Sequence, residues 1–119
     1  MNPRVETDLL GSKEIPAGVP WGIHTARALE NFPIPGNSVN PRLLKAYCQV
    51  KQACALANKE LGFLPANKAD RMIEACHSAL DTLHPPLSAL QGGAGTSTNM
   101  VVNEVIGNLA GAHPIEEVN

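Results

Sequence analysis

Residues 40–62 read NPRLLKAYCQVKQACALANKELG, and this stretch decides the fold class. Asparagine before proline is typical of a helix start, so we expect Asn40 to be the N-cap and Pro41 the first helical residue. Apolar residues follow at steps of three and four, the spacing of one helix face. Gly62 is a typical helix end. The predicted apolar stripe consists of Leu43, Leu44, Tyr47, Val50, Cys54, Ala57 and Leu61.

Two further helices are predicted after this one. The first begins at Asn67 and is broken by the His-Pro-Pro sequence at 84–86. The second runs from about Ser97 to Leu109 and ends near Gly111. Strand-like alternation is nearly absent, so the sequence predicts an all-α fold. The apolar residues of the first of these helices are Met72, Ile73, Cys76, Leu80 and Leu83.

Residues 1–39 are rich in glycine and proline, which predicts an irregular arm with turns. One short helix fits within it, from His24 to Phe32. The arm carries apolar residues that it cannot bury by itself, so they need a partner surface. We therefore expect one domain over 1–119, composed of the arm (1–39) and a helical part (40–119).

Composition excludes several classes of protein. The 119 residues carry a formal net charge of −2, with a pI near 6.0, which provides no basic surface for nucleic acid or anionic membranes. We expect neither a signal run at the N-terminus nor a membrane span. Cys48, Cys54 and Cys76 form no Cys-x-x-Cys pair, so we expect reduced core thiols and no metal site. These features predict a cytoplasmic protein.

Residues 91–100 (QGGAGTSTNM) are the strongest functional signal. Closely spaced glycines permit positive φ angles, and the following helix start offers free N–H groups to an anion. No lysine follows the last glycine, so this is not a Walker loop. The alternative is that Ser97 or Thr98 caps the helix and the glycines serve only the turn. No Lys or Arg occurs after Asp81, so any cation must come from elsewhere.

Five ordered blocks resemble the aspartase/fumarase superfamily, and Ala94 in the glycine-rich block favours its aspartate ammonia-lyase branch. The resemblance implies the N-terminal domain of the family's mostly helical fold and a carbon–nitrogen lyase that converts L-aspartate into fumarate and ammonia. A fumarase or other dicarboxylate lyase and a non-catalytic remnant or assembly domain are the alternatives. The blocks are 4–17, 22–32, 50–61, 91–106 and 113–119.

The resemblance also implies site residues for a small dicarboxylate or amino-acid substrate. Thr96 matches the family's threonine near the leaving group, Gly95 lets the backbone approach, and Ser97 and Asn99 shape the pocket. His113 matches a histidine of the accessory anion site seen in fumarases. The alternative for Thr96 is turn or capping chemistry.

Other residues have structural interpretations that we favour. His113 precedes a proline and fits a partly exposed turn, and the acidic pair at 116–117 disfavours a second dicarboxylate there. Arg27 and Glu30 suit arm docking or a subunit interface. Asn103 and Glu104, one turn into a helix, suit structural hydrogen bonds.

The family's catalytic serine loop, with its substrate-binding lysine, has no counterpart in these 119 residues. The resemblance places that loop, the central helical bundle and the C-terminal domain outside this chain. We therefore expect no catalytic base in this chain, inactivity when it is alone, and a homotetramer for the intact enzyme. No cofactor is implied, and a divalent-metal effect on the intact enzyme is left open.

Overall fold

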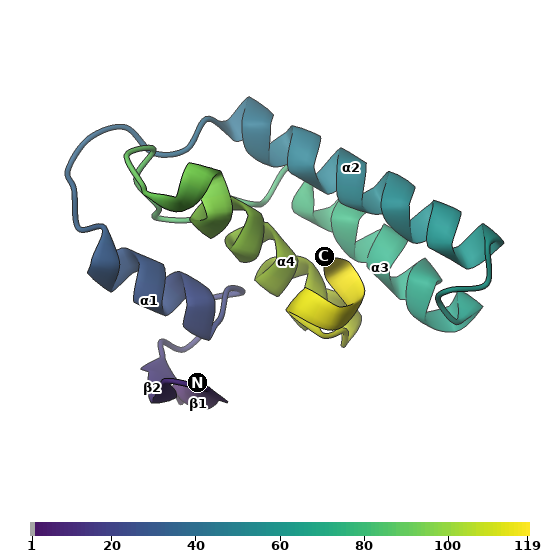
Figure 1. Cartoon of the computed structure of the whole chain (residues 1–119), viewed down its shortest axis with the longest axis horizontal. Coiled ribbons are helices and arrows are strands. Elements are labelled where there is room, and N and C mark those ends of the chain that lie inside the picture. The colour runs from purple at the N-terminus through teal and green to yellow at the C-terminus, as the bar shows by residue number, and fades with distance from the viewer. Residues whose placement is uncertain (1) are drawn as a thin grey trace.

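The computed structural model describes residues 2–119, so Met1 of the predicted arm lies outside the described residues. Helices dominate the described chain, and the predicted all-α class is confirmed (Figure 1). No helix in residues 2–119 is long and apolar enough to cross a membrane. The elements are β1 (Arg4–Asp8), β2 (Gly11–Ile15), α1 (Ile23–Asn31), α2 (Pro41–Glu60), α3 (Ala66–Ala79), η1 (Gly93–Gly95), α4 (Thr96–Ala110) and η2 (Pro114–Val118).

Strands β1 and β2 correct the prediction that the arm is irregular. They form an antiparallel hairpin whose register runs from Arg4 opposite Ile15 to Asp8 opposite Gly11. Along β1 the charged side chains face the molecule, while Val5 is 69% exposed. This reverses the alternation that identifies a half-buried strand, so sequence patterns do not predict the hairpin.

Helix α1 docks against the hairpin through an ion pair. Arg27 donates from Nε and Nη2 to the two carboxylate oxygens of Asp8, at 2.7 and 2.6 Å, and from Nη2 to the carbonyl of Gly11 at 3.0 Å. The guanidinium lowers the pKa of Asp8 to about 2. Glu30 pairs with Lys13 on β2. The predicted role of Arg27 and Glu30 in arm docking is confirmed.

Most predicted helix ends agree with the structure to within one residue, but α3 ends at Ala79, short of the predicted break at His84. The Asn40 side chain accepts a hydrogen bond from the Arg42 amide at 2.9 Å, and α2 ends just before Gly62, whose φ is 77°. Helix α3 begins one residue before the predicted Asn67. Helix α4 ends at a left-handed Gly111. These ends depend on local chemistry, which explains the agreement.

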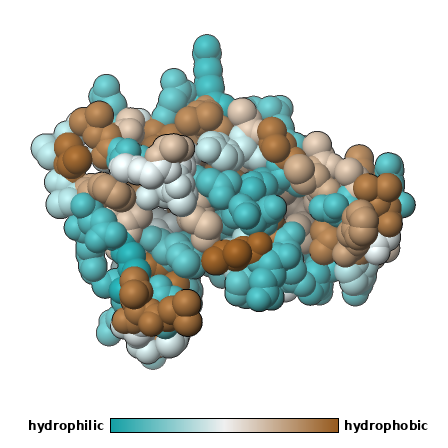
Figure 2. Space-filling view, viewed as in Figure 1, coloured by the Kyte–Doolittle hydropathy of each residue, from teal (hydrophilic) through white to brown (hydrophobic). Residues whose placement is uncertain are grey.

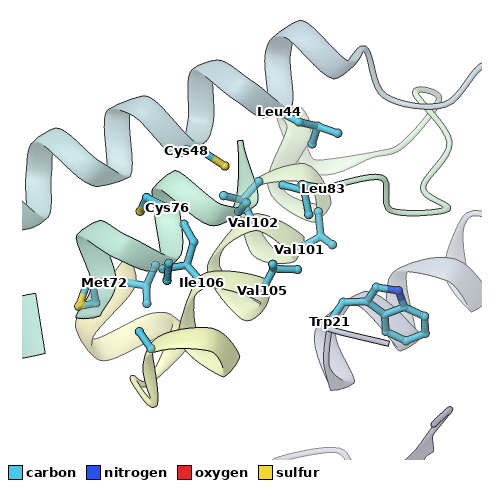
Figure 3. Packing of buried hydrophobic residues seen from close by; sticks show 14 of the residues in the cluster. Trp21, Leu44, Cys48, Met72, Cys76, Leu83, Val101, Val102, Val105 and Ile106 are labelled. Carbon is cyan, nitrogen blue, oxygen red and sulfur yellow. The ribbon is translucent and has the colours of Figure 1, made fainter. Parts of the chain in front are cut away.

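Helix α4 packs against the antiparallel α2–α3 pair and builds the core (Figures 1 and 3). Two of the predicted core thiols are buried, and burial raises the pKa of Cys76 to about 12 and also that of Cys48. The prediction for Cys54 is wrong, because it lies exposed on α2. The main core side chains are Leu44, Cys48, Met72, Cys76, Val101, Val102, Val105 and Ile106.

The predicted stripe of α2 is also largely wrong. Leu43 and Val50 on α2 and Leu61, the residue that follows it, are 49%, 59% and 68% exposed. Of the predicted stripe Leu44 is buried as expected, and the other buried residues of this helix are Cys48 and Ala55. Apolar residues occur around most of the helix, so periodicity does not select the face that packs. Apolar side chains also remain on the surface at the hairpin turn and at the α2–α3 turn (Figure 2).

We expect the isolated chain to self-associate through such exposed apolar side chains. Light scattering over a concentration series should show a mass that rises with concentration. The double variant Val50→Ser/Leu61→Ser should weaken this dependence, whereas Gln49→Ser/Glu60→Ser, changed at neighbouring exposed polar positions, should not. A concentration-independent monomer would contradict the prediction.

Candidate functional site

The glycine-rich loop takes the left-handed conformation predicted for it. Gly93, Ala94 and Gly95 have φ values of 70°, 53° and 85°, and α4 begins at the next residue. Gly95 occupies the N-cap position, where it contributes no side-chain cap. The backbone can therefore approach a ligand closely at the start of α4, where helix N–H groups favour an anion.

The first turn of α4 is capped from outside the helix. Gln91 Oε1 accepts hydrogen bonds from the amide of Thr98 at 2.9 Å and from its hydroxyl at 3.0 Å. Gln91 Nε2 donates to the carbonyl of Ser88 at 2.9 Å. The alternative that Ser97 or Thr98 caps the helix is therefore wrong. A glutamine seven residues before its partner matches no capping pattern, so the sequence does not predict this cap.

Thr96 and Ser97 lie together at a cavity of 210 Å³ between the start of α4 and α1. The exposed Thr96 hydroxyl donates to the carbonyl of Gly93. Asn99 does not line this cavity, and its side-chain amide donates instead to Asn119 at 3.0 Å. The remaining lining residues are His24, Arg27, Ala28, Asn31, Phe32 and Met100.

Helix α1 brings basic side chains to the cavity beside this loop. His24 and Arg27 line the same cavity as Thr96, although they are some seventy residues earlier in the chain. The sequence after Asp81 carries no Lys or Arg, and no local pattern identifies α1 as the source of a cation. Arg27 is paired with Asp8, so its charge is partly neutralised at this position. An anion at the cavity would meet helix N–H groups and hydroxyls as well as this basic edge.

His113 lies at a second and larger cavity, of 770 Å³, between the hairpin, α1 and η2. Its Nδ1 accepts hydrogen bonds from the amides of Ile115 and Glu116, at 3.2 and 3.1 Å. The structural interpretation of His113 as an exposed turn residue is thus confirmed. Glu117 pairs with Lys68, which lowers the carboxyl pKa. Thr96 and His113 do not share a cavity.

Two carboxylates from distant elements cap the N-terminus of α1. Glu6 on β1 accepts from the amide of Ile23 at 2.8 Å, and Glu104 on α4 accepts from the amide of Thr25 at 2.8 Å. Gly22 is the N-cap residue of α1, and a Cβ there would lie 2.3 Å from Glu104 Oε2 and 2.6 Å from Glu6 Oε2. The predicted structural role of Glu104 is confirmed, while Glu6 was not singled out.

Asn103, expected to make structural hydrogen bonds, is fully buried and donates to Asn119 at 3.1 Å. Within residues 2–119, no group of three or more His, Cys, Asp or Glu side chains is arranged to hold a metal ion.

The sequence profile of the lyase family matches residues 11–119. The chain belongs to the lyase family. Aspartate ammonia-lyase of Escherichia coli strain K12 is 44% identical over 114 residues, covering 91% of this chain and 24% of that protein. Fumarate hydratase class II of Mycobacterium tuberculosis is 40% identical over 126 residues, covering 99% of this chain and 27% of that protein. This lyase-family chain thus spans about a quarter of the length of the curated relatives it matches.

A solved structure supports the same membership for this lyase-family chain. The fumarate lyase:delta crystallin of Brucella melitensis superposes with a TM-score of 0.90 and 39% identity, covering 100% of this chain and 32% of that one. The resemblance to the aspartase/fumarase superfamily, including aspartate ammonia-lyases, is therefore confirmed.

Proposed function

We propose that this chain is the N-terminal, substrate-binding domain of an ammonia-lyase that converts L-aspartate into fumarate and ammonia. The observation that carries the proposal is the 44% identity to aspartate ammonia-lyase over most of the chain. The glycine-rich loop before the first turn of α4 supports it because a helix N-terminus favours an anionic group.

In this proposal a base from another segment removes a proton next to a substrate carboxylate, and ammonia leaves from the adjacent carbon. The intermediate carries two negative charges on one aci-carboxylate. Thr96 contacts the substrate near its leaving group, and Gly95 allows close approach of the backbone. Ser97 shapes the pocket directly, whereas Asn99, which lies outside the cavity, acts on it only through its hydrogen bond to Asn119. Donors fixed in place before the charge develops lower the barrier without reorganisation.

The wider proposal concerns the intact enzyme. Residues 1–119 act as one N-terminal domain, and a central helical bundle and C-terminal domain complete a cytoplasmic homotetramer. His113 remains a candidate for an accessory anion site, although its Nδ1 is occupied by two amides. A hydratase that forms fumarate from a hydroxy acid is the second candidate, favoured by the similarity to fumarate hydratase class II.

Exchanging this chain into two hosts tests the proposal. Residues 1–119 replace the matching segment of E. coli aspartate ammonia-lyase and, separately, of the M. tuberculosis fumarate hydratase. We expect the first chimera to retain activity on L-aspartate and the second to lose most of its activity on malate. The chain alone should form no fumarate, because it lacks the serine base and lysine.

The unmodified hosts, assayed in parallel, provide the reference rates. Retention of activity only in the hydratase host would favour the second candidate. Two folded, tetrameric but inactive chimeras would indicate a domain that serves assembly alone. Fumarate formed by the isolated chain would contradict the absence of a base.

A further inference from the structure

Glu104 is buried on α4 at the point where the arm meets the helical part. It is 2% exposed, and its Oε1 accepts from the Thr25 amide on α1. Its Oε2 is also buried and has no hydrogen-bond partner among the described residues. A buried carboxylate oxygen without a donor is costly, unless it carries the proton itself and becomes the donor.

The charged groups nearby do not neutralise Glu104. Glu6 on β1 converges with it on Gly22, and Glu6 already pairs with Arg4 at 2.8 Å. Arg27 on α1 is committed to Asp8. His24 on α1 and His113 before η2 line the same cavity. On the opposite side of α4, α3 contributes the Cys76 thiol, which stays protonated because burial raises its pKa to about 12.

Protonation resolves this arrangement. A proton on Glu104 Oε2 removes the buried charge and supplies a donor beside Gly22, the point to which Glu6 Oε2 also comes close. Burial raises the pKa of Glu104 from 4.5 to about 7, and the negative charge of Glu6 acts in the same direction. The Thr25 amide, bonded to Oε1, and the Gly22 amide, which lies near the carboxylate without meeting the geometry of a hydrogen bond to Oε2, act in the opposite direction without cancelling this effect. Glu104 therefore gains its negative charge near neutral pH.

We propose that Glu104 is a positioning residue whose bound proton, held between Glu104 and Glu6, locks the first turn of α1 and the hairpin onto α4. When the proton leaves, two carboxylates face each other around Gly22 and the arm loosens. Helix α1 also carries His24 and Arg27 to the cavity beside Thr96. Holding α1 in place therefore fixes the position of these two side chains at the candidate site. The inference goes beyond the proposed function and holds whichever substrate the site takes.

The direction of the pH dependence follows from linkage. The folded-state pKa of Glu104 lies above the unfolded value, so its contribution to stability is complete below pH 4.5 and is lost as the pH rises through about 7. The folding equilibrium constant should fall roughly sixtyfold between pH 5 and pH 7.5. The lowered pKa of Asp8 acts at much lower pH and leaves this window unaffected.

Glu104→Gln in this chain provides the sharpest test, because glutamine keeps the acceptor for Thr25 and replaces the acid proton by a permanent N–H donor. Melting curves from pH 5 to 8 should show a falling Tm for the wild type and a nearly constant Tm for the variant. Glu6→Gln should reduce the slope by removing the facing charge. His24→Gln and His113→Gln serve as controls and should keep the wild-type slope.

Two further measurements report the lock directly. Trp21, the chain's one tryptophan, is 8% exposed beside Gly22, so its emission should shift to the red as the pH rises in the wild type and not in Glu104→Gln. A carbon-13 NMR titration should give the Glu104 carboxyl a pKa well above 4.5. A value at or below 4.5, or the same Tm slope in Glu104→Gln, would overturn the proposal.

Discussion

Replacing Thr96 by alanine is expected to lower kcat/KM of the aspartate ammonia-lyase chimera by roughly a hundredfold or more. The physical reason is the loss of a hydroxyl placed at the cavity beside the N-terminus of α4, where negative charge would develop in the transition state. Steady-state kinetics on L-aspartate measure this effect, and a melting curve on the same variant shows whether the fold is preserved.

Thr82→Ala is the matched control. Its hydroxyl also makes a local hydrogen bond, to the carbonyl of Ser78 at 2.9 Å, but Thr82 does not line the cavity beside Thr96. We expect Thr82→Ala to leave kcat/KM unchanged. Near-normal turnover in Thr96→Ala, accompanied by a lower Tm, would mean that the Thr96 hydroxyl only stabilises the Gly93 turn.

Replacing Ile106 by alanine is expected to lower the free energy of unfolding of the chain by about 2–5 kcal/mol. Ile106 is 1% exposed and lies on α4 among the core side chains of α3 (Figure 3). Removing its methyl groups leaves a cavity that a closely packed helix interface fills only in part. Because domains are stable by only about 5–15 kcal/mol, this is a large fraction of the total.

Urea unfolding followed by circular dichroism measures the loss. Leu109→Ala is the control on the same helix, since Leu109 is 55% exposed and its change should alter the unfolding free energy by well under 1 kcal/mol. Equal losses for the two variants would mean that α4 does not pack on α3 as the structure has it.

The sequence by itself determined the helices and the loop between them. Asn40 and Pro41 start α2, Gly62 and Gly111 end helices, and the glycines before Thr96 predict the left-handed turn. Each of these features arises from the conformational preference of a residue and its immediate neighbours. That is why the candidate loop and the helix boundaries could be predicted without a fold.

Only the tertiary structure decided which side chains meet across the chain. It selected the Cys48 face of α2 over the Cys54 face, paired the charged strand β1 with β2, and brought Gln91 to the first turn of α4.

The two carboxylates at the start of α1 show most clearly which contacts the sequence alone does not predict. Glu104 reaches Thr25 across 79 positions of sequence, and Glu6 reaches Ile23 across 17. Helix caps of this kind follow no local spacing, because the acceptor comes from whichever element packs against the open N–H groups. Burial then raises the pKa of Glu104, and burial exists only once α4, α1 and the hairpin have come together.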